Sequence, residues 1–120
     1  MKPYYIQTKP FIVPTTDGKL IEEHFGKTSI DDGDISFAHM VAPAGWSEPF
    51  QTPEFDEITY VIKGKKQVEI GDETFILLSN QSLFIKKGVR VRYSNPHNDL
   101  AEYISICIPA FTADRAHREE

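Results

Sequence analysis

Bulky apolar residues alternate with small or polar residues along much of this chain. The alternation is clearest at residues 35–41, 89–94 and 101–108. Successive side chains of a β-strand point to opposite faces of a sheet, so a period of two predicts strands that bury one face. Shorter strands are predicted on the same grounds at residues 57–62, 66–70, 73–78 and 82–86.

Short turn sequences separate these segments. Gly71-Asp72 lies between residues 66–70 and 73–78, which predicts a β-hairpin with a two-residue loop. Lys87-Gly88 and Asn95-Pro96 end two later strands. Many short strands punctuated by Gly, Pro, Asn and Asp are typical of sandwiches and barrels. We therefore predict an all-β fold, a small antiparallel jelly-roll barrel.

The two ends of the chain are less regular. Residues 3–13 are aromatic and β-branched but contain Pro10, which cannot donate to a ladder, so they predict one or two edge strands. Residues 19–26 carry apolar side chains at helical spacing over only two turns, so a short helix and a strand are both open. We predict one domain, residues 1–120. It comprises N-terminal edge strands (1–30), a barrel (35–109) and a polar tail (110–120) with at most a short surface helix.

Composition narrows the function classes. The 120 residues are 40% hydrophobic and 26% charged, as in an ordinary globular protein. A net charge of −5 argues against non-specific binding to nucleic acid or anionic lipid. The single cysteine, Cys107, cannot form an internal disulfide, and we interpret it as a small buried apolar side chain. The N-terminus lacks the apolar run of a signal peptide, so we expect a cytoplasmic protein without membrane contact.

Residues 45–64 read G-W-S-E-P-F-Q-T-P-E-F-D-E-I-T-Y-V-I-K-G. Their spacing resembles the first motif of the cupin superfamily, G-x5-H-x-H-x3-E-x6-G. Gly45, Glu57 and Gly64 stand at the glycine and glutamate positions, whereas Gln51 and Pro53 replace both histidines. Histidines at those positions make most cupins metal proteins, so the resemblance implies the barrel but not the metal.

The second cupin motif, G-x5-P-x-G-x2-H-x3-N, is also matched in part. Gly88 and Asn95 agree with it, while Asn80, Lys86 and Val91 replace its first glycine, its proline and its histidine. The two partial motifs follow each other in the correct order, with a gap that the RmlC-like cupin barrel allows.

Two local sequences narrow the resemblance. F-D-E-I-T-Y-V-I-K-G followed by F-I-K-K-G resembles the cupin domain of the ethanolamine-utilisation protein, a group that also departs from the two-histidine pattern. The ending I-C-I-P-A-F-T-A-D-R-A-H-R-E-E is similar to the tails of stand-alone bacterial cupins. Acetate kinase activity has been ascribed to the ethanolamine-utilisation group. No phosphate-binding glycine loop carries it over to this chain, and it stays an alternative.

The resemblance places Glu57 inside the barrel, and the period of two then sets Thr59, Val61 and Tyr93 inward. A buried carboxylate needs a cation or hydrogen-bond donors. We therefore predict a polar internal pocket with Trp46 at its rim, where the indole could stack on a sugar-like ring. Glu57 is the best catalytic candidate, as an acid–base partner of a histidine or tyrosine. The predicted ligand-binding residues are Gln51, Glu57, Thr59, Tyr93, Asn95, His39, Tyr103 and Trp46.

A divalent metal is the alternative occupant of the pocket. Glu57, Gln51 and His39 would form an oxygen-rich ligand set, with Glu48 as a fourth. We favour no cofactor, because both motif histidines are replaced.

Several functions remain open. The preferred hypothesis is a cupin with a degenerate metal site that binds a small polar or carbohydrate-like metabolite, as a sensor or as an enzyme. The alternatives are a metal-independent isomerase or lyase, an acetate-kinase-like enzyme, and a metal-dependent cupin with atypical ligands. Ile58, Tyr60 and Ile62 alternate to the outer face, as do the isoleucines of residues 104–108, and this apolar surface predicts a homodimer.

Overall fold

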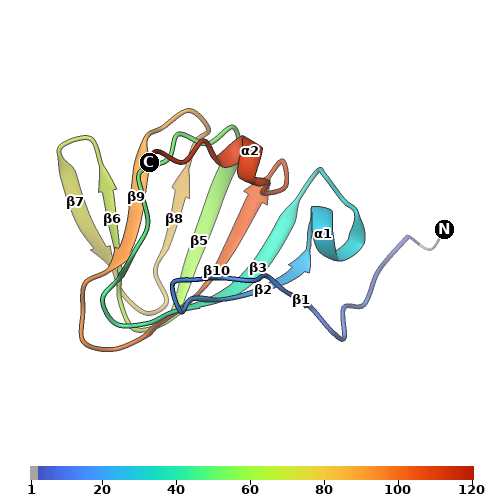
Figure 1. The fold of residues 1–120 in the computed structure, drawn as a ribbon, viewed down its shortest axis with the longest axis horizontal. Coiled ribbons are helices and arrows are strands. Elements are labelled where there is room, and N and C mark those ends of the chain that lie inside the picture. The colour runs from blue at the N-terminus through green and yellow to red at the C-terminus, as the bar shows by residue number, and fades with distance from the viewer. Residues whose placement is uncertain (1–2) are drawn as a thin grey trace.

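The computed structural model describes residues 3–120 as two antiparallel sheets (Figure 1). Within these residues, six strands pair in the order β1-β2-β3-β10-β5-β8 and four in the order β4-β9-β6-β7. The strands are β1 (Phe11–Ile12), β2 (Leu20–Phe25), β3 (Ser36–Ala42), β4 (Trp46–Ser47), β5 (Asp56–Lys63), β6 (Lys66–Ile70), β7 (Glu73–Leu77), β8 (Ser82–Ile85), β9 (Val91–Asn95) and β10 (Ala101–Ile108). Two single-turn helices accompany them in the described residues, α1 (Lys27–Ile30) and α2 (Ala113–Ala116). The all-β prediction is confirmed.

The hydrophobic core lies between the two sheets. Val61 of β5 and Tyr103 of β10 contribute from the six-stranded sheet, and Val68 of β6 and Val91 of β9 from the four-stranded sheet. The predicted hairpin is present, with β6 and β7 paired around Gly71-Asp72. In the part of the chain described, no helix is long and apolar enough to cross a bilayer.

Residues 19–26 were predicted as either a short helix or a strand, and the structure shows the strand. Residues 20–25 form strand β2, not a helix, and pair with β3 from Leu20 opposite Val41 onward. An isolated helix of two turns is marginal in water, so the long-range ladder decides the conformation. Of residues 3–13, only Phe11 and Ile12 form a strand, which lies at the sheet edge after Pro10.

The parity of β5 and β10 follows the predicted alternation. Glu57 and Thr59 are buried on the inner face, as are Tyr103 and Ser105. On β3 the inner face carries the smaller side chains, including Ser36 and Ala38. The larger aromatic residues of β3 therefore occupy the outer face.

Gly64 closes the turn between β5 and β6 and has a φ of 83°. A Cβ atom at this position would lie 2.4 Å from the carbonyl oxygen of Leu100. Both the left-handed backbone and this close approach require glycine, which explains the last glycine of the first motif. Gly71 has a similar φ of 57°, but a Cβ atom there would meet nothing within 4 Å.

We predict that Gly64→Ala destabilises the fold more than Gly71→Ala. Both substitutions carry the left-handed backbone penalty of about 1–2 kcal/mol. Only the first adds a steric conflict with backbone, which costs a further ~1–3 kcal/mol. Urea denaturation of the two variants and the wild type measures the difference, and equal losses would contradict the role given to the Leu100 carbonyl.

Candidate functional site

A cavity of about 80 Å³ lies inside the barrel. One water needs roughly 10–15 Å³, so the cavity holds several waters or a molecule of a few non-hydrogen atoms. Its wall carries charge of both signs, an unusual content for a barrel interior. The charged residues that line it are Lys19, Lys66, Arg118, Glu23, Glu48 and Glu57.

Glu57 lies on the inner face of β5 and is held by two hydroxyl donors. Tyr93 of β9 donates to Oε1 at 3.0 Å, and Ser105 of β10 donates to Oε2 at 2.5 Å. Burial raises the pKa of Tyr93 well above its usual value, and the neighbouring Glu57 charge raises it further. The tyrosine therefore stays protonated and remains a donor to the carboxylate.

Lys66 stands at the start of β6 with its side chain wholly inside the barrel. Its Nζ donates to Thr59 Oγ1 at 3.0 Å and lies 4.0 Å from the ring centre of Tyr93 and 3.8 Å from that of Tyr103. Desolvation lowers the pKa of Lys66 to about 7, although the charge of Glu57 opposes the shift. Such an amine is both a donor and, when neutral, a nucleophile.

Lys19 is the second buried amine and comes from the turn before β2. Its Nζ lies 4.1 Å from the ring centre of Trp46 and 5.2 Å from that of Tyr103. Burial lowers the pKa of Lys19, with Glu48 the main opposing charge. Within residues 3–120, no carboxylate oxygen lies within 4.0 Å of Nζ of Lys19 or Lys66.

The C-terminal tail forms part of the cavity wall. It runs beside the loop between β4 and β5. There Glu54 N donates to Arg115 O at 2.8 Å, and Glu119 N donates to Phe50 O at 2.8 Å. This pairing brings Arg118 to the cavity. Its guanidinium donates to Gln51 Oε1 at 3.2 Å and lies 3.3 Å from Glu48 Oε2.

The hydroxyl of Tyr103 has no hydrogen-bond partner in the described part of the chain. The residue is 1% exposed and lines the cavity. A buried hydroxyl without a partner costs ~1–3 kcal/mol, so such a group calls for water or a ligand beside it. Burial raises the pKa of Tyr103 well above its usual value, so the hydroxyl is protonated and able to donate.

Four predicted ligand-binding residues line the cavity: Gln51, Glu57, Tyr93 and Tyr103. Glu48, predicted only as a metal ligand, joins them, and burial raises the pKa of its carboxyl group against the charges of Lys19 and Arg118.

Three further predicted residues are buried but have structural partners. Thr59 donates to Ile104 O and accepts from Lys66. The amide of Asn95 donates to backbone carbonyls, among them Asp99 O at 2.8 Å. The prediction of Trp46 at the rim is wrong. The indole is 5% exposed, donates to Asp17 at 2.7 Å and is covered by Lys19, so it offers no face to a sugar ring.

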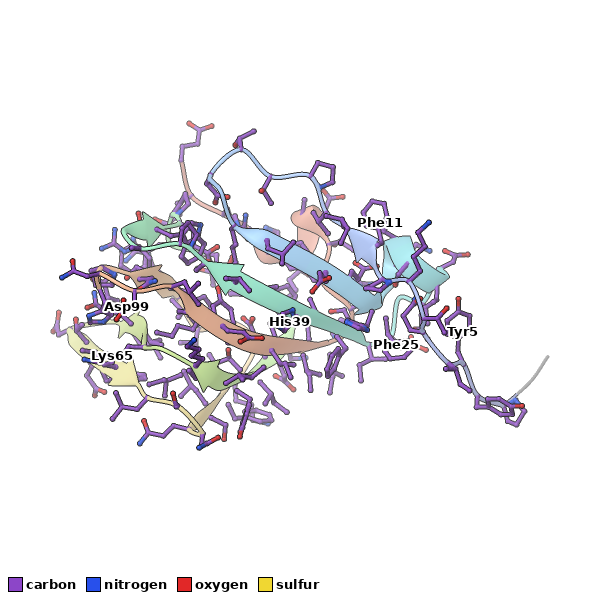
Figure 2. The ribbon with its side chains drawn as sticks, turned by 90° about the horizontal axis from the view of Figure 1, so that it is seen from below. Tyr5, Phe11, Phe25, His39, Lys65 and Asp99 are labelled. Atoms are coloured by element: carbon purple, nitrogen blue, oxygen red, sulfur yellow. The ribbon has the colours of Figure 1, made fainter. Side chains whose placement is uncertain are left out.

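The prediction that His39 reaches the pocket is also wrong. It lies on the outer face of β3, beside β2 and β10 (Figure 2). Its Nδ1 is 2.7 Å from Glu22 Oε1 and its Nε2 is 2.6 Å from Glu102 Oε2. Partial burial opposes the charged form, but the hydrogen bonds to Glu102 and Glu22 raise the pKa of His39. The inner face of β3 belongs to Ser36, Ala38 and Met40, so the parity of the strand excludes His39.

The residues of the cavity do not fit the divalent metal that most cupins bind. Glu57 already accepts from Tyr93 and Ser105, and Gln51 and Glu48 face Arg118. Among the described residues, no cluster of three or more His, Cys, Asp or Glu side chains is arranged to hold a metal ion. The amines of Lys19 and Lys66, when protonated, would also repel a metal cation.

Sequence reasoning missed Lys66, Lys19, Arg118 and Ser105. Two of them could have been found from the alternation of their strands. Lys66 lies two residues before buried Val68, and Ser105 lies two residues after buried Tyr103, so each shares the inner face of its strand. The tail, predicted only as a polar segment with at most a short helix, packs against its own chain. Cys107 is buried as expected, and burial raises the pKa of its thiol, so it is a poor nucleophile.

The sequence profile of the cupin domain (Cupin_2) matches residues 38–107. The chain belongs to the cupin domain family. It is also 37% identical over 108 residues to a protein named Endoribonuclease YbeY from Myxococcus xanthus (strain DK1622). That match covers 90% of this chain but only 37% of the relative's length.

Solved cupin structures share the fold at low identity. An RmlC-like cupin from Shewanella frigidimarina has a TM-score of 0.73 at 14% identity, covering 92% of this chain and 93% of the other. The EutQ protein of Clostridium difficile has a TM-score of 0.62 at 21% identity, with 88% and 77% covered. An RmlC-like cupin from Methanocaldococcus jannaschii, with a double-stranded β-helix fold, has a TM-score of 0.70 at 16% identity, with 89% and 94% covered. These likenesses support the cupin barrel and the similarity to the ethanolamine-utilisation group.

We predict that Lys66 makes the stability of this cupin depend on pH. Folding lowers the pKa of Lys66 from 10.5 to about 7, so between these values the unfolded chain binds more protons. The free energy of unfolding therefore rises as pH increases through this window, by up to ~1.4 kcal/mol per unit. Urea denaturation at several pH values measures the slope. Replacing the amine in Lys66→Met should reduce the slope, to which buried Lys19 also contributes, and an unchanged slope would contradict the assignment. Lys65→Met, at the exposed neighbour, is the control.

Proposed function

We propose that this cupin binds a small polar metabolite in the barrel cavity without a metal. The observation that carries the proposal is the Tyr103 hydroxyl, which is fully buried and has no partner in the described residues, on a side chain that lines the cavity. A ligand oxygen beside it would satisfy the hydroxyl and recover the free energy lost in burying it.

The free hydrogen-bonding groups of the cavity define the ligand's chemistry. The carboxylates are already engaged, Glu57 by two hydroxyls and Glu48 by Arg118. The third, Glu23, accepts from the backbone amide of Ser29. The amines of Lys19 and Lys66 are donors and cannot accept when protonated. A ligand rich in acceptor oxygens, such as a small carboxylate or carbonyl compound, complements them better than a sugar. The cavity volume and the covered face of Trp46 also favour a small acyclic ligand over a carbohydrate.

The names of the similar proteins are not the basis of this proposal. The endoribonuclease name belongs to a protein that extends well beyond the match, and the net charge of −5 does not favour RNA as a substrate here. We propose ligand binding as the common element of the sensor and enzyme alternatives.

We predict that acetate stabilises the protein against heat more than acetamide does, because acetamide has the same shape without the charge. Tyr103→Phe should weaken acetate binding by about tenfold, equivalent to ~1.4 kcal/mol. It should leave the unliganded protein as stable or more stable, because it removes a buried hydroxyl without a partner. Calorimetric titration and thermal unfolding measure the two effects.

Tyr60→Phe is the matched control, since Tyr60 donates to Asn80 on the exposed outer face. It should leave acetate affinity unchanged. The proposal fails if neither acetate nor acetamide binds, or if Tyr103→Phe binds as tightly as wild type.

We further propose that a second copy of the chain covers the outer face of the six-stranded sheet. Apolar side chains from β5, β8 and β10 lie together there, with Ile58 opposite both Phe84 and Ile106. Phe84 is 53% exposed and Ile108 is 47% exposed. An exposed apolar face of several adjoining strands is uncommon on a monomer.

Sedimentation velocity at micromolar concentration tests the dimer. Phe84→Glu and Ile108→Glu should each shift the protein toward the mass of the monomer, because they place charge in the proposed interface. Ile76→Glu is the control, since Ile76 is 43% exposed on β7 of the other sheet. A monomeric wild type would remove the proposal.

A further inference from the structure

We propose that Lys66 is a covalent site, whose amine forms an imine with a small aldehyde or ketone bound in the cavity. The inference rests on the proposed ligand-binding function and names the reactive group of the ligand. Lys66 is the candidate because its side chain is buried and lines the cavity, and because Thr59 and two tyrosine rings position its amine.

The contacts of Lys66 leave its nitrogen available for reaction. A lysine in an ion pair is held in its protonated form, which has no lone pair for attack. In the described chain no carboxylate oxygen is within 4.0 Å of Lys66 Nζ. The amine is positioned by one hydrogen bond, to Thr59, and by the ring faces of Tyr93 and Tyr103. All of these groups are neutral, so none of them forms an ion pair with the amine.

Desolvation, more than the surrounding charges, keeps a substantial fraction of the amine neutral. The titratable groups that face Lys66 are Glu57 of β5, Lys19 before β2, Glu48 after β4 and Cys107 of β10, together with its two tyrosine neighbours. Desolvation and Lys19 outweigh the carboxylates, which leaves the pKa at about 7. An amine desolvated in this way is a recognised route to a nucleophilic lysine.

The proposed step balances without an oxidant or reductant. The Nζ lone pair attacks the carbonyl carbon, a C–N bond forms, and the carbonyl π electrons move to the oxygen. Nitrogen loses a proton while the oxygen gains one, giving a carbinolamine. A second proton on that oxygen allows it to leave as water as the C=N bond forms. The iminium nitrogen then releases its remaining proton to give the imine. The Tyr103 hydroxyl and the Lys19 ammonium group are donors on the cavity wall, and Glu57 can receive a proton.

The positions of the other cations suggest an oxo acid as the ligand class. Lys19 and Arg118 both face Glu48, so they lie on one side of the cavity, whereas Lys66 interacts chiefly with Glu57. A carboxylate directed toward Lys19 and Arg118 would leave a neighbouring carbonyl for Lys66. The small volume restricts the ligand to a few carbon atoms. An imine also draws electrons from the adjacent carbon, which is the activation that isomerases and lyases require.

Reductive trapping tests the proposal directly. The protein is incubated at pH 7.4 with glyoxylate, the smallest oxo acid, and sodium cyanoborohydride, which reduces an imine to a stable secondary amine. Peptide mapping with fragmentation then compares carboxymethylation at Lys66 and at exposed Lys65. An exposed lysine has a pKa of about 10.4, so only ~0.1% of such amines are neutral at this pH. We expect at least about tenfold more label on Lys66 than on Lys65, and a ratio near one in urea.

Variants and competition separate this inference from the binding proposal. Lys66→Met should lose the preferred label, whereas Lys65→Met should retain it, and acetate should slow trapping at Lys66. Equal labelling of the two lysines in the folded protein overturns the imine. If acetate binds but Lys66 is not trapped, the binding proposal stands and the imine fails. If neither acetate binds nor Lys66 is labelled, both fail.

Discussion

The cost of removing charge from water constrains the whole interior of this barrel. A charged group without partners inside a protein is strongly destabilising. Glu57 meets this cost with the hydroxyls of Tyr93 and Ser105, contributed by β9 and β10, so its position depends on both sheets. Lys66 meets it differently, through one hydroxyl, two aromatic faces and a lowered pKa. The barrel interior thus contains a carboxylate whose two oxygens both accept hydrogen bonds. It also contains an amine that is positioned by a hydroxyl and not by an ion pair.

The C-terminal tail adds a second constraint, because it fixes the loop where other cupins carry their histidines. Gln51 occupies one histidine position and forms bridges both to Val91 and to Arg118 of the tail. Val91 itself stands at the histidine position of the second motif. Neither an amide nor an aliphatic side chain is the imidazole ligand that transition metals prefer. Arg118 then brings a guanidinium to the same region, which suits an anionic ligand.

The sequence predicted the barrel well because hydrophobic periodicity and turn residues are local signals. The inner face of β5 and the β6–β7 hairpin follow directly from them. The site was predicted less completely. His39 was misplaced because strand parity tells which residues share a face but not which face is inside. Lys19 and Arg118 could not be found by periodicity, since a turn and a tail reach the cavity only through tertiary contacts. The burial of Trp46 could not be predicted from the sequence, because its partner Asp17 lies far away along the chain.

The two buried lysines differ in ways that matter for any ligand with both an acid and a carbonyl group. Lys19 interacts mainly with Glu48, which also faces Arg118, so that side of the cavity holds a guanidinium as well as an amine. Lys66 interacts mainly with Glu57, whose oxygens are already occupied by hydroxyl donors. A carboxylate therefore gains most from the first region, where the guanidinium of Arg118 lies beside Glu48. A carbonyl carbon gains most from the second, where the amine can lose its proton. The different partners of the two lysines are therefore the basis of the chemistry that we propose for this cavity.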